Sequence, residues 1–448
     1  MPASTSSPAL PDPNGRRVPY PRGTATTLHL IEEQARATPD ADALYYDGAT
    51  LSYRELDRRA NSLAAMLVDH GARRETLLPL LVSDGMELPL AMVAAMKAGV
   101  PFIPFDPGWP RERIGALLRG LGTDIAVVSP RTPAPAAGCA RALVADHRKL
   151  DGTDAAPAGG RPGRTDLAYG FFTSGTTGLP KCTLNVHRGL LNRFLYMTRR
   201  FGAGHVALQN SRSVFDSSLW QLLWPLTMGG SVVMPRRDGL LDLERTVDQI
   251  GRHGVTITDF VPSIFTVLVD LLASDPALVR AAGSLRHVLL GGEAINVEAV
   301  RRFHGLLPGT AITNTYGPTE ASIGSVFHTV TAGGAVAAPA TRYPSAAPST
   351  TPRRWSWTPR CGVWARARPA RSSSAATAWG WATSATRSGP GRRSCPTPSP
   401  TSPATASTAP ATSATTGPTA ACTSWGGATT SSRCAGCGSN RRRSSGRC

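Results

Sequence analysis

Apolar and polar positions alternate along the first third of the chain in a pattern typical of successive strands and helices. The helical segments carry apolar residues three or four positions apart, as at Leu56, Ala60 and Leu63, and Gly71 or Gly99 ends them. Short apolar runs predict strands at residues 42–46, 77–82, 101–105 and 125–128, with a further strand starting at residue 51. This alternation predicts an α/β fold with a mostly parallel sheet layered by helices.

The pattern continues beyond residue 130. Residues 130–165 are rich in Ala, Pro, Gly and Arg and predict a connector with one short strand at 142–145. We expect strands at 167–172 and 288–290 and a helix at 183–199. His187 falls on that helix, where a single histidine is most often a capping or core residue, so we assign it no role. Residues 1–25, rich in Pro, Ser and Gly, are predicted to be disordered.

Positive charge is concentrated at the C-terminal end. The formal net charge is +18, but residues 321–448 hold 15 Arg and no Asp, Glu or Lys, which leaves +3 for residues 1–320. The body of the chain therefore gives no reason to expect nucleic-acid binding. Cys434 and Cys437 form a Cys-x-x-Cys pair, but no histidine follows His328, so we expect no zinc site. Without a signal-like start or a long apolar run, we expect a cytoplasmic chain that does not bind membranes.

Residues 172–181 gather hydroxyls, glycines and a lysine. Gly175 and Gly178 allow backbone conformations that turn successive N–H groups toward an anion. Hydroxyl donors and a positive charge come from Thr173, Ser174, Thr176, Thr177 and Lys181. The stretch does not fit the Walker pattern, so taken alone it is either a flexible surface loop or a phosphate-binding loop of another type.

The whole string resembles the phosphate loop of the adenylate-forming superfamily of AMP-dependent synthetases and ligases. It is most similar to the amino-acid adenylation domains of nonribosomal peptide synthetases, and further stretches match in order over roughly residues 25–330. The resemblance implies a large N-terminal adenylate-forming domain at residues 26–331 that uses ATP and Mg²⁺. The implied reaction converts an amino acid to an aminoacyl adenylate and releases pyrophosphate. An acyl- or aryl-CoA ligase with the same nucleotide site is the alternative.

Residues 314–320 match the adenine and magnesium segment of that family. By this resemblance Tyr316 stacks on adenine, Thr319 contacts phosphate and Glu320 binds magnesium, and we count Thr319, Glu320 and Lys181 as catalytic. The resemblance also implies nucleotide contacts from Asn314, Gly317, Gly291, Gly292 and Glu293. Alone, residues 314–320 would be interpreted as a turn centred on glycine and proline.

Residues 214–218 distinguish the subfamilies. In amino-acid adenylation domains an aspartate after the phenylalanine of this motif pairs with the substrate α-ammonium, and Asp216 occupies that place. Outside the resemblance, Asp216 would be a helix cap. Alignment around the motifs implies a pocket wall of Ser217, Trp220, Asp259, Leu289, Gly291, Thr315, Ile323 and Gly324. Because a buried carboxylate such as Asp259 needs a partner, we expect a lysine-, ornithine- or arginine-like substrate.

After about residue 331 the resemblance stops. Residues 332–448 form a tail rich in Ala, Ser, Thr, Pro and Arg, which we expect to be disordered. In the family, this part of the chain carries a ribose-binding aspartate, a hinge and a small C-terminal domain with its lysine. We assigned GC-rich codons to residues 344–358, 375–389 and 433–441 and read these codons in one shifted frame. All three segments then encode family-like sequence, so we infer a frameshift between about residues 331 and 343. Thioester transfer would need a carrier protein with phosphopantetheine in trans. A catalytically inactive nucleotide-binding remnant is a further alternative.

Overall fold

The computed structural model describes residues 26–82, 85–132, 141–158, 160–173, 180–236 and 242–330, with Tyr20, Gly23 and the backbone of residues 355–358 and 363–366. These residues belong to one compact unit, Met1–Ser373, whereas Ser374–Cys448 is a second unit outside the described residues. The predicted disorder of residues 1–25, and most of the predicted tail, therefore fall outside the description.

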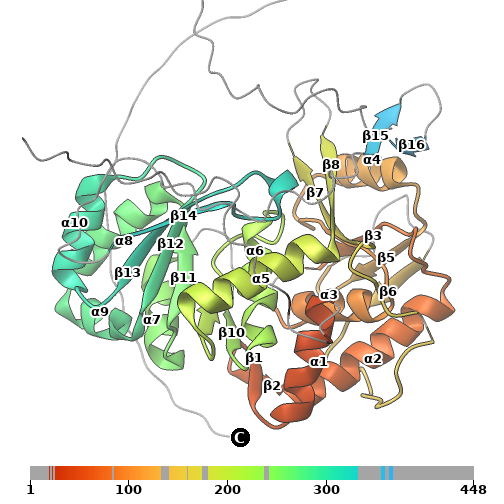
Figure 1. The fold of residues 1–448 in the computed structure, drawn as a ribbon, viewed down its shortest axis with the longest axis horizontal. Helices are drawn as coiled ribbons and strands as arrows, with labels where there is room; N and C mark the ends of the chain where they lie inside the picture. Colours follow the sequence, from red (N-terminus) through yellow and green to blue (C-terminus); the bar gives the residue numbers. More distant parts are fainter. Residues whose placement is uncertain are drawn as a thin grey trace, which may run out of the picture. The chain divides into compact units, whose positions relative to one another are not determined.

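Eight strands form the larger sheet, named sheet A (Figure 1). Its order is β14 (Val326–Val330), β13 (Ala311–Tyr316), β12 (His287–Gly291), β11 (Ile257–Phe260), β9 (Val206–Leu208), β10 (Ser231–Met234), β1 (Asp42–Tyr46) and β2 (Ala49–Ser52). Neighbours are parallel except at the two edges, where β14 and β2 run antiparallel to their partners. The predicted mostly parallel sheet is confirmed, and its strands are short apolar runs, as expected for a sheet covered on both faces.

A second sheet of six strands, sheet B, has the order β6 (Arg141–Val144), β5 (Ile125–Val128), β3 (Leu78–Leu81), β4 (Phe102–Pro104), β7 (Leu167–Thr173) and β8 (Lys181–Val186). Only β8 is antiparallel to its neighbour. Sheet B contains the strands predicted from residues 77–145, so the β-α-β interpretation of that region is confirmed.

One predicted element is wrong at its start. Residues 183–186 were expected to begin a helix, but they continue β8, and the helix α5 (His187–Phe201) begins at His187. The reason is pairing: Phe171 lies opposite Thr183 and Tyr169 opposite Asn185 in the antiparallel β7–β8 ladder. Alternating side chains let Cys182 and Leu184 fill a core on one face of the strand.

Ten α-helices cover the two sheets in the described part of the chain. Besides α5 they are α1 (Thr27–Ala37), α2 (Tyr53–Asp69), α3 (Glu87–Lys97), α4 (Arg111–Leu121), α6 (Ser217–Leu223), α7 (Leu243–His253), α8 (Pro262–Ser274), α9 (Pro276–Ala281) and α10 (Val297–Leu306). In β3, Leu80 packs into a core shared by both sheets and Leu81 into a core under α4. In β12, Leu289 joins the shared core, while Val288 and Leu290 pack with α7, α8 and α10. At β3 and β12 each sheet is therefore buried on both faces.

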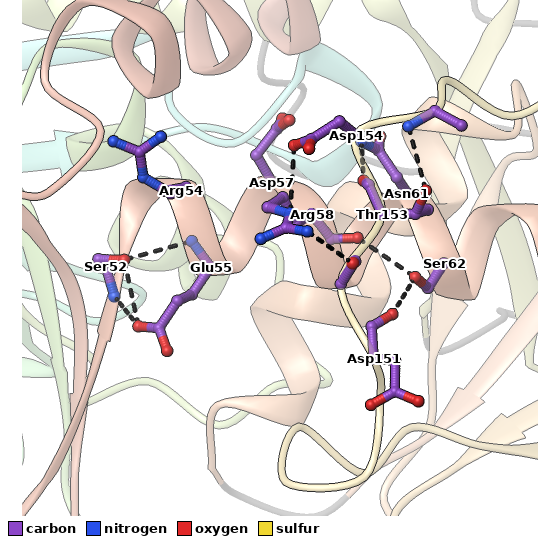
Figure 2. Close-up of polar contacts among 12 residues, drawn as sticks. Ser52, Arg54, Glu55, Asp57, Arg58, Asn61, Ser62, Asp151, Thr153 and Asp154 are labelled. Carbon is purple, nitrogen blue, oxygen red and sulfur yellow. Dashed lines mark hydrogen bonds and ion pairs between the residues drawn. The ribbon is translucent and has the colours of Figure 1, made fainter.

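Helix α2 shows how local chemistry sets an element boundary (Figure 2). Ser52 and Glu55 form a capping box in which Ser52 N donates to Glu55 Oε2 at 2.9 Å and Glu55 N donates to Ser52 Oγ at 3.2 Å. The strand predicted from residue 51 therefore ends at Ser52. On the same helix, Asn61 Nδ2 donates to Thr153 O at 2.9 Å and Arg58 Nε pairs with Asp154 at 3.1 Å, so the end of the predicted connector is held against α2.

Two strands lie within the predicted tail. β15 (Trp355–Thr358) and β16 (Val363–Arg366) form an antiparallel pair. Tryptophan and valine favour strands, which gives these two segments a local preference that the rest of the composition lacks. The remainder of the tail is outside the described residues.

Candidate functional site

A cavity of about 1030 Å³ opens at the carboxyl ends of the sheet A strands. This is the edge at which ligands bind in parallel α/β sheets. Every residue predicted for the substrate pocket lines it: Asp216, Ser217, Trp220, Asp259, Leu289, Gly291, Thr315, Ile323 and Gly324. They come from α6, β11, β12, β13 and the segment after β13, so the structure brings together residues more than a hundred positions apart.

Asp216 stands directly before α6. Its side chain makes no capping hydrogen bond to that helix, which disfavours the helix-cap interpretation. Its Oδ2 atom is buried and has no hydrogen-bond partner among the described residues. Burial raises the pKa of Asp216 to about 6, although contacts from Thr319 and from the backbone of Ser217 and Ile323 lower it, and the charge of Glu320 raises it slightly. A buried oxygen of this kind would be stabilised by a cation delivered from the cavity.

Asp259 has a different environment. Ser211 Oγ donates to its two carboxylate oxygens at 3.1 and 3.2 Å, and Gln221 Nε2 donates to Oδ1. Ser217 Oγ donates in turn to Ser211 Oγ at 2.9 Å. The protein itself therefore supplies hydrogen-bond donors to Asp259. Sequence reasoning missed Ser211 and Gln221, whose only signal is their polarity beside a sheet edge.

Most of the nucleotide-binding residues predicted at the carboxyl ends of β12 and β13 lie at the same cavity. Gly291, Gly292, Glu293, Tyr316 and Gly317 line it, whereas Asn314 does not. Tyr316 is 70% exposed, so its ring is open for stacking. Gly317 has no room for a side chain, since a Cβ there would lie 2.5 Å from Ile323 O. Glu293 Oε2 accepts a hydrogen bond from Ser263 N at 3.0 Å, which also gives it a structural role at the start of α8.

Thr319 and Glu320 lie in the 3₁₀ turn η3 (Thr319–Ala321), which packs on β8. Thr183 Oγ1 donates to Glu320 Oε1 at 3.4 Å. Lys181, Thr183 and Asn185 alternate along β8 and share the face that meets this turn. An exposed carboxylate beside hydroxyl oxygens is a donor set that suits Mg²⁺, which takes oxygen ligands and keeps several waters.

The phosphate loop itself is only partly described. Thr173 ends β7 opposite Lys181 in the ladder, and Thr173 Oγ1 donates to Lys181 O at 3.5 Å. Ser174, Gly175, Thr176, Thr177 and Gly178 lie outside the described residues. The ladder nevertheless places the predicted phosphate lysine at the foot of the loop, on the strand face that meets Glu320.

Two other features of the described residues lie outside this cavity. His187 is 2% exposed, and burial lowers its pKa to about 4, as expected for a neutral core histidine. Glu87, Asp146 and His147 have ligand atoms within 4.8 Å of one another, and His147 Nδ1 and Glu87 Oε1 form a hydrogen bond of 2.7 Å.

No single helix of the described chain has the length and apolarity to cross a membrane. Among the described residues, one pair of helices, Pro262–Ser274 and Pro276–Ser284, is long and apolar enough when taken together, but the chain bends by 115° between them. Phe265, Leu268 and Leu272 of α8 pack into the protein core.

Known proteins resemble this chain over the same region. The AMP-binding enzyme family model matches residues 31–365, which extends past residue 331, where the resemblance was expected to end. Phosphinothricin tripeptide synthetase PhsB of Streptomyces viridochromogenes is 37% identical over 303 residues, which cover 66% of this chain and 25% of that protein. Tyrocidine synthase 3 of Brevibacillus parabrevis is 35% identical over 309 residues, covering 68% of this chain and 5% of that protein.

A solved structure agrees with these relatives. The nonribosomal peptide synthetase FmoA3 is similar with a TM-score of 0.64 and 27% identity, covering 71% of this chain and 33% of that one. The chain thus spans a quarter or less of the length of the two curated relatives. Since the family model matches most of its length, the chain belongs to the AMP-binding enzyme family and, within it, is similar to the adenylation domains of nonribosomal peptide synthetases.

Proposed function

We propose that this chain binds ATP and an α-amino acid and joins them as an aminoacyl adenylate. A carboxylate oxygen of the amino acid attacks the α-phosphorus, the bond to the β-phosphate oxygen breaks, and pyrophosphate leaves. The observation that carries the proposal is the buried Oδ2 of Asp216, which lacks a protein partner in the described structure and faces a cavity of amino-acid size or larger. A substrate ammonium would supply the missing charge and hydrogen bonds.

The nucleotide half would act by position and charge. Tyr316 would stack on adenine, and the loop before Lys181 would hold the phosphates. Glu320 would hold Mg²⁺ with its waters, and Thr319 would contact the phosphates. The ion would offset the charge that develops on the leaving phosphates. Lys181 would add a second positive charge at the triphosphate. Their shared placement around β8 and η3 supports this assignment.

For the substrate side chain, we propose a cationic amino acid of the lysine, ornithine or arginine type. Ser211 and Gln221 donate to Asp259, which also lines the cavity, so its carboxylate would attract a cation there even though it has protein partners. A panel of amino acids in an ATP–pyrophosphate exchange assay tests this proposal. Best turnover with an aliphatic side chain would contradict it.

The same assay tests the proposed reaction as a whole. Exchange that depends on an amino acid and disappears in Asp216→Ala supports it, whereas exchange driven equally by fatty or aryl acids favours a CoA ligase. Nucleotide binding without any exchange favours an inactive remnant.

Because the reaction consumes ATP, we place it in the cytoplasm.

We also propose that a frameshift produced the sequence after about residue 331 and that the adenylate passes to a phosphopantetheine carrier protein in trans. The three family-like segments in one shifted frame support the frameshift. Resequencing the coding DNA across codons 324–360 tests it, because a missing or extra base is expected there. An intact reading frame would contradict it.

A further inference from the structure

A strained turn forms part of the cavity wall. Ser322 and Ile323 are consecutive non-glycine residues with positive φ, 61° and 73°. Left-handed backbone is rare for a β-branched residue such as isoleucine, and it persists only where neighbouring contacts hold it. Ile323 lines the cavity, and its backbone contacts the Asp216 carboxylate. The conformation of this turn therefore shapes the amino-acid half of the site.

Asn185 ties the turn to sheet B. Its side chain is 5% exposed, and its two amide atoms contact two different parts of the segment after β13. Nδ2 donates to Thr319 O at 3.1 Å, and Oδ1 accepts from Ser322 Oγ at 3.0 Å. One side chain thus fixes the distance between the predicted phosphate residue Thr319 and the strained turn.

Helix α5 holds the turn from a second side. Arg193 is 4% exposed and donates from Nε to Ser322 O at 3.3 Å. Its charge lies 5.2 Å from the ring centre of Phe327 and 5.6 Å from that of Tyr196. One turn earlier, Gly189 lets the helix approach, since a Cβ there would lie 2.3 Å from Ser322 Oγ.

We propose that Asn185, Gly189 and Arg193 form a clamp of positioning residues that holds the Ser322–Ile323 turn and couples the amino-acid half of the site to its nucleotide half. The clamp rests on the proposed function, because it assumes that the cavity beside Asp216 takes the amino acid. Its contacts are asymmetric. Arg193 hydrogen-bonds to Ser322, on the amino-acid side, whereas Asn185 hydrogen-bonds both to Ser322 and to Thr319, on the nucleotide side.

The asymmetry can be tested by binding. The nucleotide probe is AMPPNP with Mg²⁺. The amino-acid probe is chosen from the proteinogenic amino acids and ornithine, as the one that most raises the melting temperature of the AMPPNP-bound wild type. Calorimetric titration then gives both Kd values for wild type, Arg193→Met and Asn185→Leu. Arg199→Met, an exposed arginine on the same helix, is the matched control.

We expect Arg193→Met to raise the Kd of the amino acid about tenfold, the effect of losing a hydrogen bond from a charged donor, and to leave the Kd of AMPPNP unchanged. Asn185→Leu should raise both constants, and Arg199→Met neither. A folded Arg193→Met with both constants unchanged, or with both raised equally, overturns the clamp. If Arg193→Met does not fold, Ser322→Ala decides, since it should weaken amino-acid binding selectively. A wild type that binds AMPPNP but no amino acid refutes the proposed function itself.

Discussion

Replacing Asp216 by asparagine should stabilise the free protein while it removes amino-acid binding. In the folded state burial raises the pKa of this carboxyl from 3.8 to about 6. Each tenfold change in an acid dissociation constant is worth about 1.36 kcal/mol, so ionised Asp216 costs the folded state about 3 kcal/mol at neutral pH. The isosteric amide carries no charge, and Asp216→Asn should therefore raise the free energy of unfolding by up to about 3 kcal/mol.

The effect has a defined pH window. Because the pKa of Asp216 is higher in the folded state, the folded wild type binds a proton that the unfolded chain does not bind between pH 3.8 and about 6. Wild-type stability falls as pH rises through this window, and the variant lacks that loss. The advantage of Asp216→Asn should thus be full above about pH 6 and absent below pH 3.8.

Thermal unfolding between pH 4 and pH 8 measures this difference, and a gain of about 3 kcal/mol corresponds to several degrees in Tm. Asp259→Asn is the matched control, because Ser211 and Gln221 already donate to that carboxylate and its loss should not stabilise the protein. Equal stability of wild type and Asp216→Asn at pH 8, or equal gains from both variants, would refute the reasoning.

Three further predictions rest on single contacts. In Lys97→Met, Asp57 loses the Nζ that lies 2.8 Å from it, while buried Glu32 loses its 3.2 Å contact but keeps Arg161 at 2.7 Å. Urea denaturation should therefore show a loss of about 3 kcal/mol, the lower end for breaking a buried ion pair, and a loss below about 1 kcal/mol would contradict this. Tyr316→Ala should weaken AMPPNP binding about tenfold at unchanged Tm, since its ring is exposed; unchanged affinity would exclude stacking. Glu320→Gln should raise the Mg²⁺ concentration needed for AMPPNP binding in a titration, and an unchanged requirement would remove Glu320 from the metal site.

The sequence predicted the fold well where periodicity was strong. Strands β3, β4 and β5 are short apolar runs, and the helices between them, α3 and α4, end just before Gly99 and Gly122. Local signals and tertiary packing therefore agree in this region. Helix α5 begins later than predicted because residues 183–186 pair with β7, and this pairing with a distant segment leaves no local mark in the sequence. Likewise, β2 ends at Ser52 because Ser52 and Glu55 form the capping box of α2.

The site was predictable only in part, for a similar reason. Asp216, Trp220 and Ile323 could be assigned to one pocket because a family resemblance supplies an alignment between distant segments. The donors to Asp259 and the contacts of Asn185 join residues far apart in sequence, and no local pattern marks them. The positive φ of Ile323 could not be foreseen, because its residue type argues against it.

The most direct test of the central claim is the affinity of one amino acid compared with that of its des-amino analogue in the presence of AMPPNP and Mg²⁺. If Asp216 binds the α-ammonium, loss of that group should weaken binding about 10- to 100-fold in wild type and have little further effect in Asp216→Asn. Equal affinity of the two acids for the wild type would contradict the assignment of this cavity to an amino acid.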